Sequence, residues 1–150
     1  MIRLKRTSNK DNDFKGLVME LDNDLQGRYQ NIQYQYNAYT DVSKINTVVI
    51  AYIQDIAVGC GCFKEIGDDT VEIKRMFVNP YFRGFGVASS IIEELLTWAK
   101  QLYYADAVLE TGKRQPESIK LYSKHGFNII ENFGPYVGME ESVCMQRPLK

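Results

Sequence analysis

The sequence predicts an α/β fold (mixed α+β) in which helices cover a mixed, mostly antiparallel sheet of about seven strands. Two observations support this fold class. Three strand-like runs at 46–52, 56–64 and 71–78 follow one another with only short turns between them, which is typical of antiparallel hairpins. Further along the chain, amphipathic helical runs alternate with short apolar runs, which places helices on the faces of the same sheet.

The N-terminal part of the chain predicts one strand and one helix. Residues 2–7 alternate between apolar and polar side chains, as a half-buried strand does. Asp11 or Asn12 can cap a helix, and Gly27 can end it. Between them, apolar residues recur at helical spacing: Phe14, Leu17, Val18, Leu21 and Leu25. Residues 29–39 are rich in Tyr, Gln and Asn without a clear period, so they predict a loop or a weak second helix.

The C-terminal half predicts two helices and three further strands. Pro80 ends the third strand of the meander because proline has no N–H to donate to a neighbouring strand. A helix over about 84–103 follows, with one apolar face made of Ile91, Ile92, Leu95, Leu96, Ala99 and Leu102. A short buried strand at 107–109 comes next, then a helix over 118–124 with Pro116 in its first turn and Gly126 as its stop. Strands at 127–130 and 142–147 close the fold.

Composition and charge predict a cytoplasmic globular protein with one domain over residues 1–150. Of the 150 residues, 45% are hydrophobic and 25% are charged. No apolar run reaches the ~20 residues that cross a bilayer, and no apolar segment of a secretory signal follows the N-terminus. We therefore expect no membrane partner. The net charge of −1 gives no indication of nucleic-acid binding.

Cysteine and histidine usage argues against a disulfide scaffold and a metal site. Cys60, Cys62 and Cys144 are odd in number, whereas a disulfide scaffold needs pairs. A zinc site usually needs four ligands, and His125 is the only histidine. We expect small buried thiols, no metal, and a role for His125 at a helix C-terminus.

The stretch Arg83-Gly84-Phe85-Gly86-Val87-Ala88, between a strand and a long helix, predicts a phosphate site. Glycines let backbone N–H groups approach a ligand closely, and a helix N-terminus adds unpaired N–H groups with partial positive charge. Residues 74–124 hold 8 Lys/Arg and 5 Asp/Glu, an excess that suits a polyanion or arises by chance on solvated faces.

Two other phosphate-binding motifs fit this turn poorly. A Walker loop requires Ser or Thr after Gly-Lys, but Arg114 follows Gly112-Lys113. A dinucleotide fingerprint requires a third glycine where Ser89 stands. The preceding strand also carries Glu72 and Lys74, whereas a central parallel strand is expected to be almost continuously apolar.

The glycine turn and a second motif, Leu121-Tyr122-Ser123-Lys124-His125-Gly126-Phe127, together resemble the GCN5-related N-acetyltransferase (GNAT) family. The resemblance covers roughly residues 45–130. It implies a GNAT-like sheet and acetyl-CoA as co-substrate. It places Met76, Phe77 and Val78 along the pantetheine arm. It places Arg83, Gly84, Phe85, Gly86, Val87 and Ala88 at the pyrophosphate, and Tyr122 near the sulfur.

Two positions depart from the family pattern. Gln115 stands where the family often has asparagine, and its longer amide can make the same contact. Ser118 stands where alanine is common and can add a hydrogen bond to the cofactor.

Acetyl transfer to an amine also needs a base, because an alkylammonium has a pKa near ~10. The resemblance makes Glu72 the first candidate, since many members carry a catalytic glutamate there. A glutamate on a solvated strand face is the alternative, and Glu110 is the second candidate. The developing oxyanion is expected to meet a backbone N–H near Phe77 or Val78, and Tyr122 is expected to donate to the thiolate.

The resulting prediction is an N-acetyltransferase that moves the acetyl group from acetyl-CoA to a primary amine of a small molecule or peptide by direct transfer in a ternary complex. Two alternatives stay open: a non-catalytic acyl-CoA-binding regulatory domain, and an acyltransferase that uses another acyl-CoA. Homodimers are frequent in the family. Five tyrosines are candidates to line the acceptor pocket or to cover the core edge: Tyr29, Tyr34, Tyr36, Tyr39 and Tyr136. Trp98 is expected to pack at the core or its edge.

Overall fold

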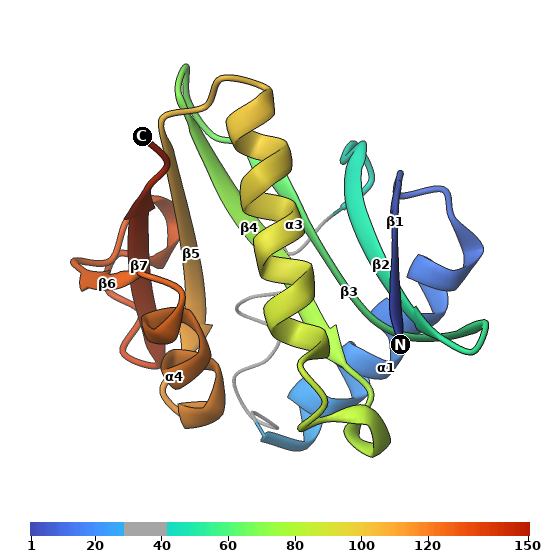
Figure 1. The fold of residues 1–150 in the computed structure, drawn as a ribbon. Helices are drawn as coiled ribbons and strands as arrows, with labels where there is room; N and C mark the ends of the chain where they lie inside the picture. Colours follow the sequence, from blue (N-terminus) through green and yellow to red (C-terminus); the bar gives the residue numbers. More distant parts are fainter. Residues whose placement is uncertain (29–41) are drawn as a thin grey trace.

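A computed structural model describes residues 1–28 and 42–150 of the chain, and this part contains a seven-stranded sheet with helices on both faces (Figure 1). The strands are β1 (Ile2–Thr7), β2 (Thr47–Ile53), β3 (Ile56–Glu65), β4 (Thr70–Val78), β5 (Asp106–Gly112), β6 (Asn128–Ile130) and β7 (Ser142–Pro148). The α-helices are α1 (Asn12–Arg28), α3 (Val87–Gln101) and α4 (Pro116–Lys124). The fold class expected from the sequence is confirmed.

The sheet divides where β4 meets β5. The strand order is β1-β2-β3-β4-β5-β7-β6, and every neighbouring pair is antiparallel except β4 and β5. This parallel pair is in register only from Thr70 opposite Asp106 to Ile73 opposite Leu109. Beyond Ile73 the two strands separate toward their C-terminal ends (Figure 1). The main-chain groups of β4 that face this gap therefore have no strand partner on that side.

Two apolar layers cover the two faces of the sheet. The helix α3 packs its buried side (Val87, Ile91, Ile92, Leu95, Leu96 and Ala99) against one face. Gly59 of β3 allows this approach, since a Cβ there would lie 2.9 Å from the main-chain oxygen of Phe77 and 3.1 Å from Ile91 Cδ1. On the other face, α1 contributes Phe14, Leu17 and Leu21 to a layer that includes Cys60 and Cys62. All three cysteines are free and buried, as the sequence predicts.

A β-bulge in β4 changes the direction in which its residues point. Cys60 is paired with Phe77, but Cys62 is paired with Lys74, so two residues of β4 lie opposite Gly61. Arg75, one of the two, has a φ of 58°. Its guanidinium bonds Asp22 of α1 at 2.6 Å, on the face where Lys74 also points toward Glu72. The bulge thus places successive polar side chains on one face beside the gap.

Three expectations need correction or lie outside the structure. The helix predicted from about 84 begins at Val87, because Gly84 and Gly86 have left-handed φ values of 89° and 83° that an α-helix does not contain. The strand predicted at 107–109 extends over Asp106–Gly112, since β7 pairs with its whole length. The loop or helix predicted for residues 29–39 lies outside the described residues.

The expectation about β4 was also wrong. It is a central strand, parallel to β5, although it carries buried Glu72 and Lys74.

In the part of the chain that the structure describes, no helix is long and apolar enough to cross a membrane. The same part contains no group of three or more His, Cys, Asp or Glu residues arranged to hold a metal ion.

Candidate active site

A pocket of about 820 Å³, counting its open mouth, occupies the gap between β4 and β5. The lining side chains come from α1, β4, the end of β5, α4 and the segments around Tyr136 and Glu141. They are Leu21, Leu25, Glu72, Ile73, Lys74, Arg75, Met76, Glu110, Thr111, Gly112, Gln115, Ser118, Tyr122, Tyr136 and Glu141. The divergence of the two strands therefore creates a cleft that elements distant in sequence complete.

The turn between β4 and α3 presents unpaired backbone donors. Gly86 is the N-cap of α3, and no main-chain bond from the N–H groups of Gly84 through Ser89 to another described residue is present. A Cβ added at Gly84 or Gly86 would meet nothing within 4 Å, so the space above both glycines is open. Unpaired N–H groups at a helix N-terminus facing open space form an anion site.

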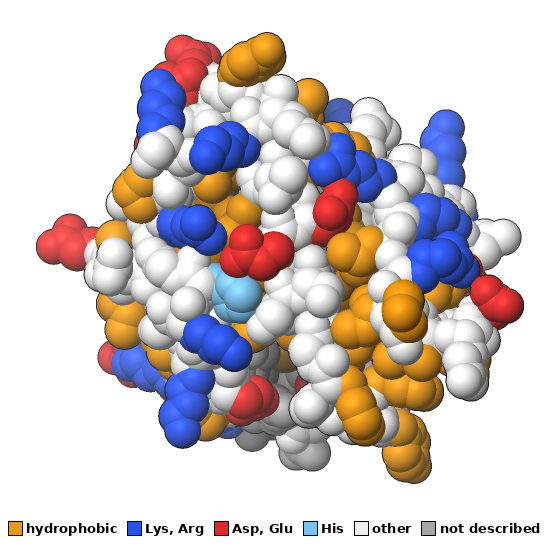
Figure 2. All heavy atoms as spheres, viewed as in Figure 1, with side chains coloured by type: hydrophobic (Ala, Val, Ile, Leu, Met, Phe, Trp, Pro, Cys, Tyr) orange, Lys and Arg blue, Asp and Glu red, His pale blue; other side chains and the backbone are white. Residues whose placement is uncertain are grey.

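Arg83 is tied to the end of β4 rather than projecting freely. Its Nε donates to the oxygen of Val78 at 2.9 Å, and its guanidinium lies 5.8 Å from the centre of the Phe77 ring. The side chain is 40% exposed, and its Nη2 lies 4.0 Å from Asp24 Oδ2 of α1, so the guanidinium stays near the turn. Figure 2 shows hydrophobic side chains gathered over the same turn, where Tyr81 and Phe85 are exposed.

The backbone of Val78 points into the gap. The N–H of Asn79 donates to the main-chain oxygen of Val58 in β3 at 2.8 Å. Because main-chain groups alternate in direction along a strand, the N–H and C=O of Phe77 point toward β3, and those of Val78 point away from it. The bond from Arg83 to the Val78 oxygen agrees with this direction. The side chains of Phe77 and Val78 are buried in opposite apolar layers. Of the two candidate N–H donors, only that of Val78 faces the gap.

Tyr122 projects from α4 into the pocket. Its ring is 6% exposed and packs edge-on against Phe127 with centroids 5.8 Å apart. No hydrogen bond to a described residue occupies its hydroxyl. Burial and, secondarily, the charge of Glu110 raise the pKa of Tyr122 well above its ordinary value. The phenol therefore stays protonated and can donate a hydrogen bond into the pocket.

Glu72 is buried among polar partners. The side chain is 6% exposed, so the alternative of a solvated strand face is wrong. The hydroxyl of Tyr136 donates to Glu72 Oε2 at 2.7 Å, and Lys74 Nζ lies 3.7 Å from the same oxygen. Burial raises the pKa of Tyr136, and nearby Glu72 raises it further. Burial also lowers the pKa of Lys74, an effect that Glu72 opposes.

Glu110 lies on the opposite side of the gap, near the end of β5. Ser142 Oγ donates to its Oε2 at 2.7 Å, and Oε1 has no partner among the described residues. Burial raises the pKa of Glu110 from 4.5 to about 7, and the bond from Ser142 opposes the rise. A carboxyl that titrates near neutral pH beside an open pocket is suited to accept a proton from a substrate.

Comparison with known proteins decides the family. The model of the Acetyltransferase (GNAT) family matches residues 14–127. The chain belongs to the GNAT family. An IAA acetyltransferase from Azospirillum brasilense is 36% identical over 105 residues, which cover 67% of this chain and 67% of that protein. The resemblance read from the two motifs is confirmed.

Solved structures show the same GNAT fold. A Klebsiella pneumoniae protein, provisionally assigned as an acyl-CoA N-acyltransferase, aligns with a TM-score of 0.85 at 26% identity, over 100% of this chain and 99% of that chain. The PaiA N-acetyltransferase of Thermoplasma acidophilum, solved with coenzyme A, aligns at 0.73 over 99% of both chains. Its identity of 14% supports a shared fold alone.

The GNAT fold brings together most of the residues singled out from the sequence. Met76, Gln115, Ser118 and Tyr122 line one pocket with both candidate bases. Val87 differs, because its side chain is buried under α3 and only its N–H faces the turn. Of the five tyrosines, Tyr136 lines the pocket, and the other four lie outside the described residues. Trp98 packs edge-on against Phe63 as expected.

Sequence reasoning missed three features of the site. Lys74 lines the pocket, Ser142 holds Glu110, and Leu21 and Leu25 of α1 form an apolar wall. The two leucines were assigned only to a helix face, and Ser142 carried no signal. The β5–β7 register, which pairs Gly112 with Ser142, brings that serine within reach of Glu110.

Proposed function

We propose that this GNAT protein moves the acetyl group from acetyl-CoA to a primary amine of a small molecule or peptide, by direct transfer in a ternary complex. One observation carries the proposal: unpaired N–H groups at the start of α3 lie beside a split sheet whose pocket contains Tyr122, the buried Glu72 and the partly buried Glu110. The named acetyltransferase relative supports an acetyl donor. The PaiA protein, which shares the fold, was solved with coenzyme A.

The residues present fit coenzyme A. Its diphosphate needs several donors and room close to the main chain, which the turn from Gly84 to Ser89 supplies. Its pantetheine amides need free main-chain groups, which the unpaired edge of β4 beyond Ile73 supplies. Gln115 and Ser118 of α4 add polar side chains to the pocket. When bound, acetyl-CoA supplies an acyl group activated as a thioester.

Two carboxyls compete for the role of base, and the geometry favours Glu110. An ammonium must lose a proton before nitrogen can attack, and a base that titrates near pH 7 is suited to accept it. Glu110 has an unoccupied oxygen and a pKa raised to about 7. Glu72, the first candidate from sequence, already binds Tyr136 and lies near Lys74. We propose Glu110 as the base and keep Glu72 as the alternative.

The remaining groups act on the carbonyl oxygen and the sulfur. Val78 N–H is the candidate donor to the oxygen that gains negative charge when the C–N bond forms. As the C–S bond breaks, Tyr122 is the candidate donor to the leaving sulfur. A phenol and a thiol differ by ~1.5 pKa units, and burial of Tyr122 widens this gap. Its main effect is therefore a hydrogen bond rather than complete proton transfer.

A second hollow marks a route for the amine acceptor. It shares Glu72, Lys74 and Tyr136 with the pocket and extends to Lys64 of β3 and to Phe133. Both signs of charge line it, so it does not restrict the acceptor to one charge class. The identity of the acceptor, the homodimer and the cytoplasmic location remain predictions.

The test combines binding and turnover. Calorimetric titration of the purified chain with coenzyme A is expected to show one site, and Gly86→Glu is expected to abolish it by adding a side chain and negative charge to the turn. A panel of amines, polyamines, amino acids and peptides, offered with acetyl-CoA, identifies the acceptor by release of free thiol. Normal coenzyme A binding by Gly86→Glu would contradict the proposed site. Binding without thiol release from any amine would favour the non-catalytic alternative.

A further inference from the structure

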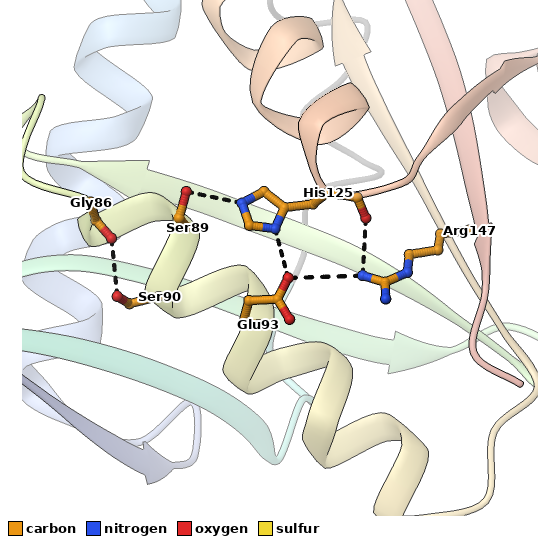
Figure 3. A network of polar contacts seen from close by, with 6 residues as sticks. All are labelled: Gly86, Ser89, Ser90, Glu93, His125 and Arg147. Atoms are coloured by element: carbon orange, nitrogen blue, oxygen red, sulfur yellow. Dashed lines mark hydrogen bonds and ion pairs between the residues drawn. The ribbon is translucent and has the colours of Figure 1, made fainter.

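Four side chains connect α3, α4 and β7 beside the glycine turn (Figure 3). We call Ser89, Glu93, His125 and Arg147 the His125 network. The imidazole of His125 lies between two residues of α3, with Nε2 2.9 Å from Ser89 Oγ and Nδ1 2.7 Å from Glu93 Oε1. Ser89 and Glu93 are four residues apart, so they project from one face of the helix.

Arg147 of β7 completes the His125 network. Arg147 Nη1 donates to the main-chain oxygen of His125 at 2.9 Å and lies 3.9 Å from Glu93 Oε1. The His125 side chain is 11% exposed, and Figure 2 shows the histidine at the surface beside a carboxylate. The ring is therefore fixed through both its backbone and its two nitrogens.

The partners of the ring determine where its protons lie. The Glu93 carboxylate only accepts hydrogen bonds, so Nδ1 carries a proton and donates to it. In the neutral ring, Nε2 then accepts the single hydroxyl proton of Ser89. In the charged ring, Nε2–H donates to Ser89 Oγ, and the Ser89 hydroxyl is free to donate elsewhere.

Ser89 lies where such a donor meets an anion. It is the third residue of α3 after the N-cap Gly86, and its own N–H belongs to the unpaired set of the turn. When Nε2–H donates to Ser89 Oγ, the Ser89 hydroxyl can donate its own proton to an anion held by these N–H groups. Glu93 on α3 and Arg147 on β7 are the charged residues that contact His125.

We propose that Ser89 is a further donor to the diphosphate and that His125 is its positioning residue. The two motifs that identify the family are thereby joined: the residue before Gly126 in the second motif directs the hydroxyl of Ser89, the residue that follows the first motif. This inference rests on the proposed function, since the anion in question is the diphosphate of coenzyme A. It adds a side-chain contact, with its own support, to the main-chain donors of the turn.

The experiment compares two acetyl donors, one with the diphosphate and one without it. Acetyl-CoA and S-acetylpantetheine carry the same thioester, but only acetyl-CoA carries the nucleotide and its phosphates. Ser89→Ala and His125→Phe are each expected to raise the acetyl-CoA KM and the coenzyme A Kd about tenfold, the usual size of one hydrogen bond to a charged group. The kcat for acetyl-CoA and the kcat/KM for S-acetylpantetheine are expected to stay unchanged.

Three further variants test whether the residues act as a unit. The double variant is expected to lose no more than either single one, because each removes the same contact. His125→Gln, which keeps an N–H near the position of Nε2, is expected to recover part of the affinity. Ser123→Ala, an exposed serine on α4, is the matched control and is expected to behave as wild type.

Several results would overturn the proposal. If a variant lost kcat/KM equally with acetyl-CoA and with S-acetylpantetheine, the cause would be a general packing defect. If the losses of affinity in the two single variants added up in the double variant, Ser89 and His125 would act separately. Wild-type affinity in Ser89→Ala would exclude the contact even if His125→Phe does not fold. Failure of the wild-type chain to bind coenzyme A would contradict the proposed function itself, a result distinct from variants that match a wild type able to bind.

Discussion

Replacing Glu110 with glutamine is expected to slow the reaction and stabilise the protein at alkaline pH. The carboxyl is partly buried, and this loss of solvent raises its pKa from 4.5 to about 7. Between these values the native state binds more protons than the unfolded chain, so the wild type loses stability as pH rises. At 1.36 kcal/mol per pKa unit, the loss approaches about 3 kcal/mol by pH 8.

Glutamine stays neutral, so Glu110→Gln avoids this loss and can still accept the bond from Ser142. Its stability relative to wild type is expected to grow by about 3 kcal/mol between pH 4.5 and pH 8. Urea denaturation at several pH values measures the difference, in which all other titrating groups cancel. Glu140→Gln removes the same charge from an exposed position and is expected to leave the pH dependence of stability unchanged.

The same substitution tests catalysis. If Glu110 accepts the proton, wild-type kcat/KM rises about tenfold per pH unit below pH 7 and then levels. Glu110→Gln is expected to lose this acidic limb and ~10²–10⁴-fold in rate. A constant stability difference across the pH range would refute the buried, proton-binding carboxyl. An unchanged acidic limb in Glu110→Gln would assign the base to another group, with Glu72→Gln as the next variant to measure.

Three further substitutions test other parts of the structure. Tyr122→Phe is expected to lower turnover at least tenfold while leaving the coenzyme A Kd measured by calorimetry nearly unchanged, because only the hydroxyl that we propose as a donor to the sulfur is lost; unchanged turnover would remove Tyr122 from the mechanism. Gly59→Ala is expected to destabilise the protein by about 1–3 kcal/mol in urea denaturation, since its Cβ would lie 2.9 Å from a main-chain oxygen. Gly16→Ala, in an exposed position of α1 with nothing within 4 Å, is its control and is expected to stabilise by about 0.5–1 kcal/mol; equal effects of the two would contradict the close packing of α3.

Most of the fold could be predicted because its signals are local. The alternation in β1, the β-branched run of β2 and the apolar stripe of α3 each depend on neighbours in sequence. The end of β5 was missed for the opposite reason. Glu110 and Thr111 are polar, and only pairing with β7 makes their segment a strand. Likewise, the polar side chains of β4 argued against a central strand. Glu72 can be buried there because Tyr136, 64 residues away in sequence, donates a hydrogen bond to it.

By itself, the sequence determined the family and the location of the glycine turn that we propose for the diphosphate, since glycine spacing before a helix depends on backbone conformation within a few residues. Only the tertiary structure decided what each acid can do. Both glutamates line one pocket, but Ser142 leaves one oxygen of Glu110 open, whereas Tyr136 and Lys74 surround Glu72. The pKa of a side chain and its unoccupied hydrogen-bond acceptors depend on burial and on partners from distant strands. No local sequence pattern encodes these partners.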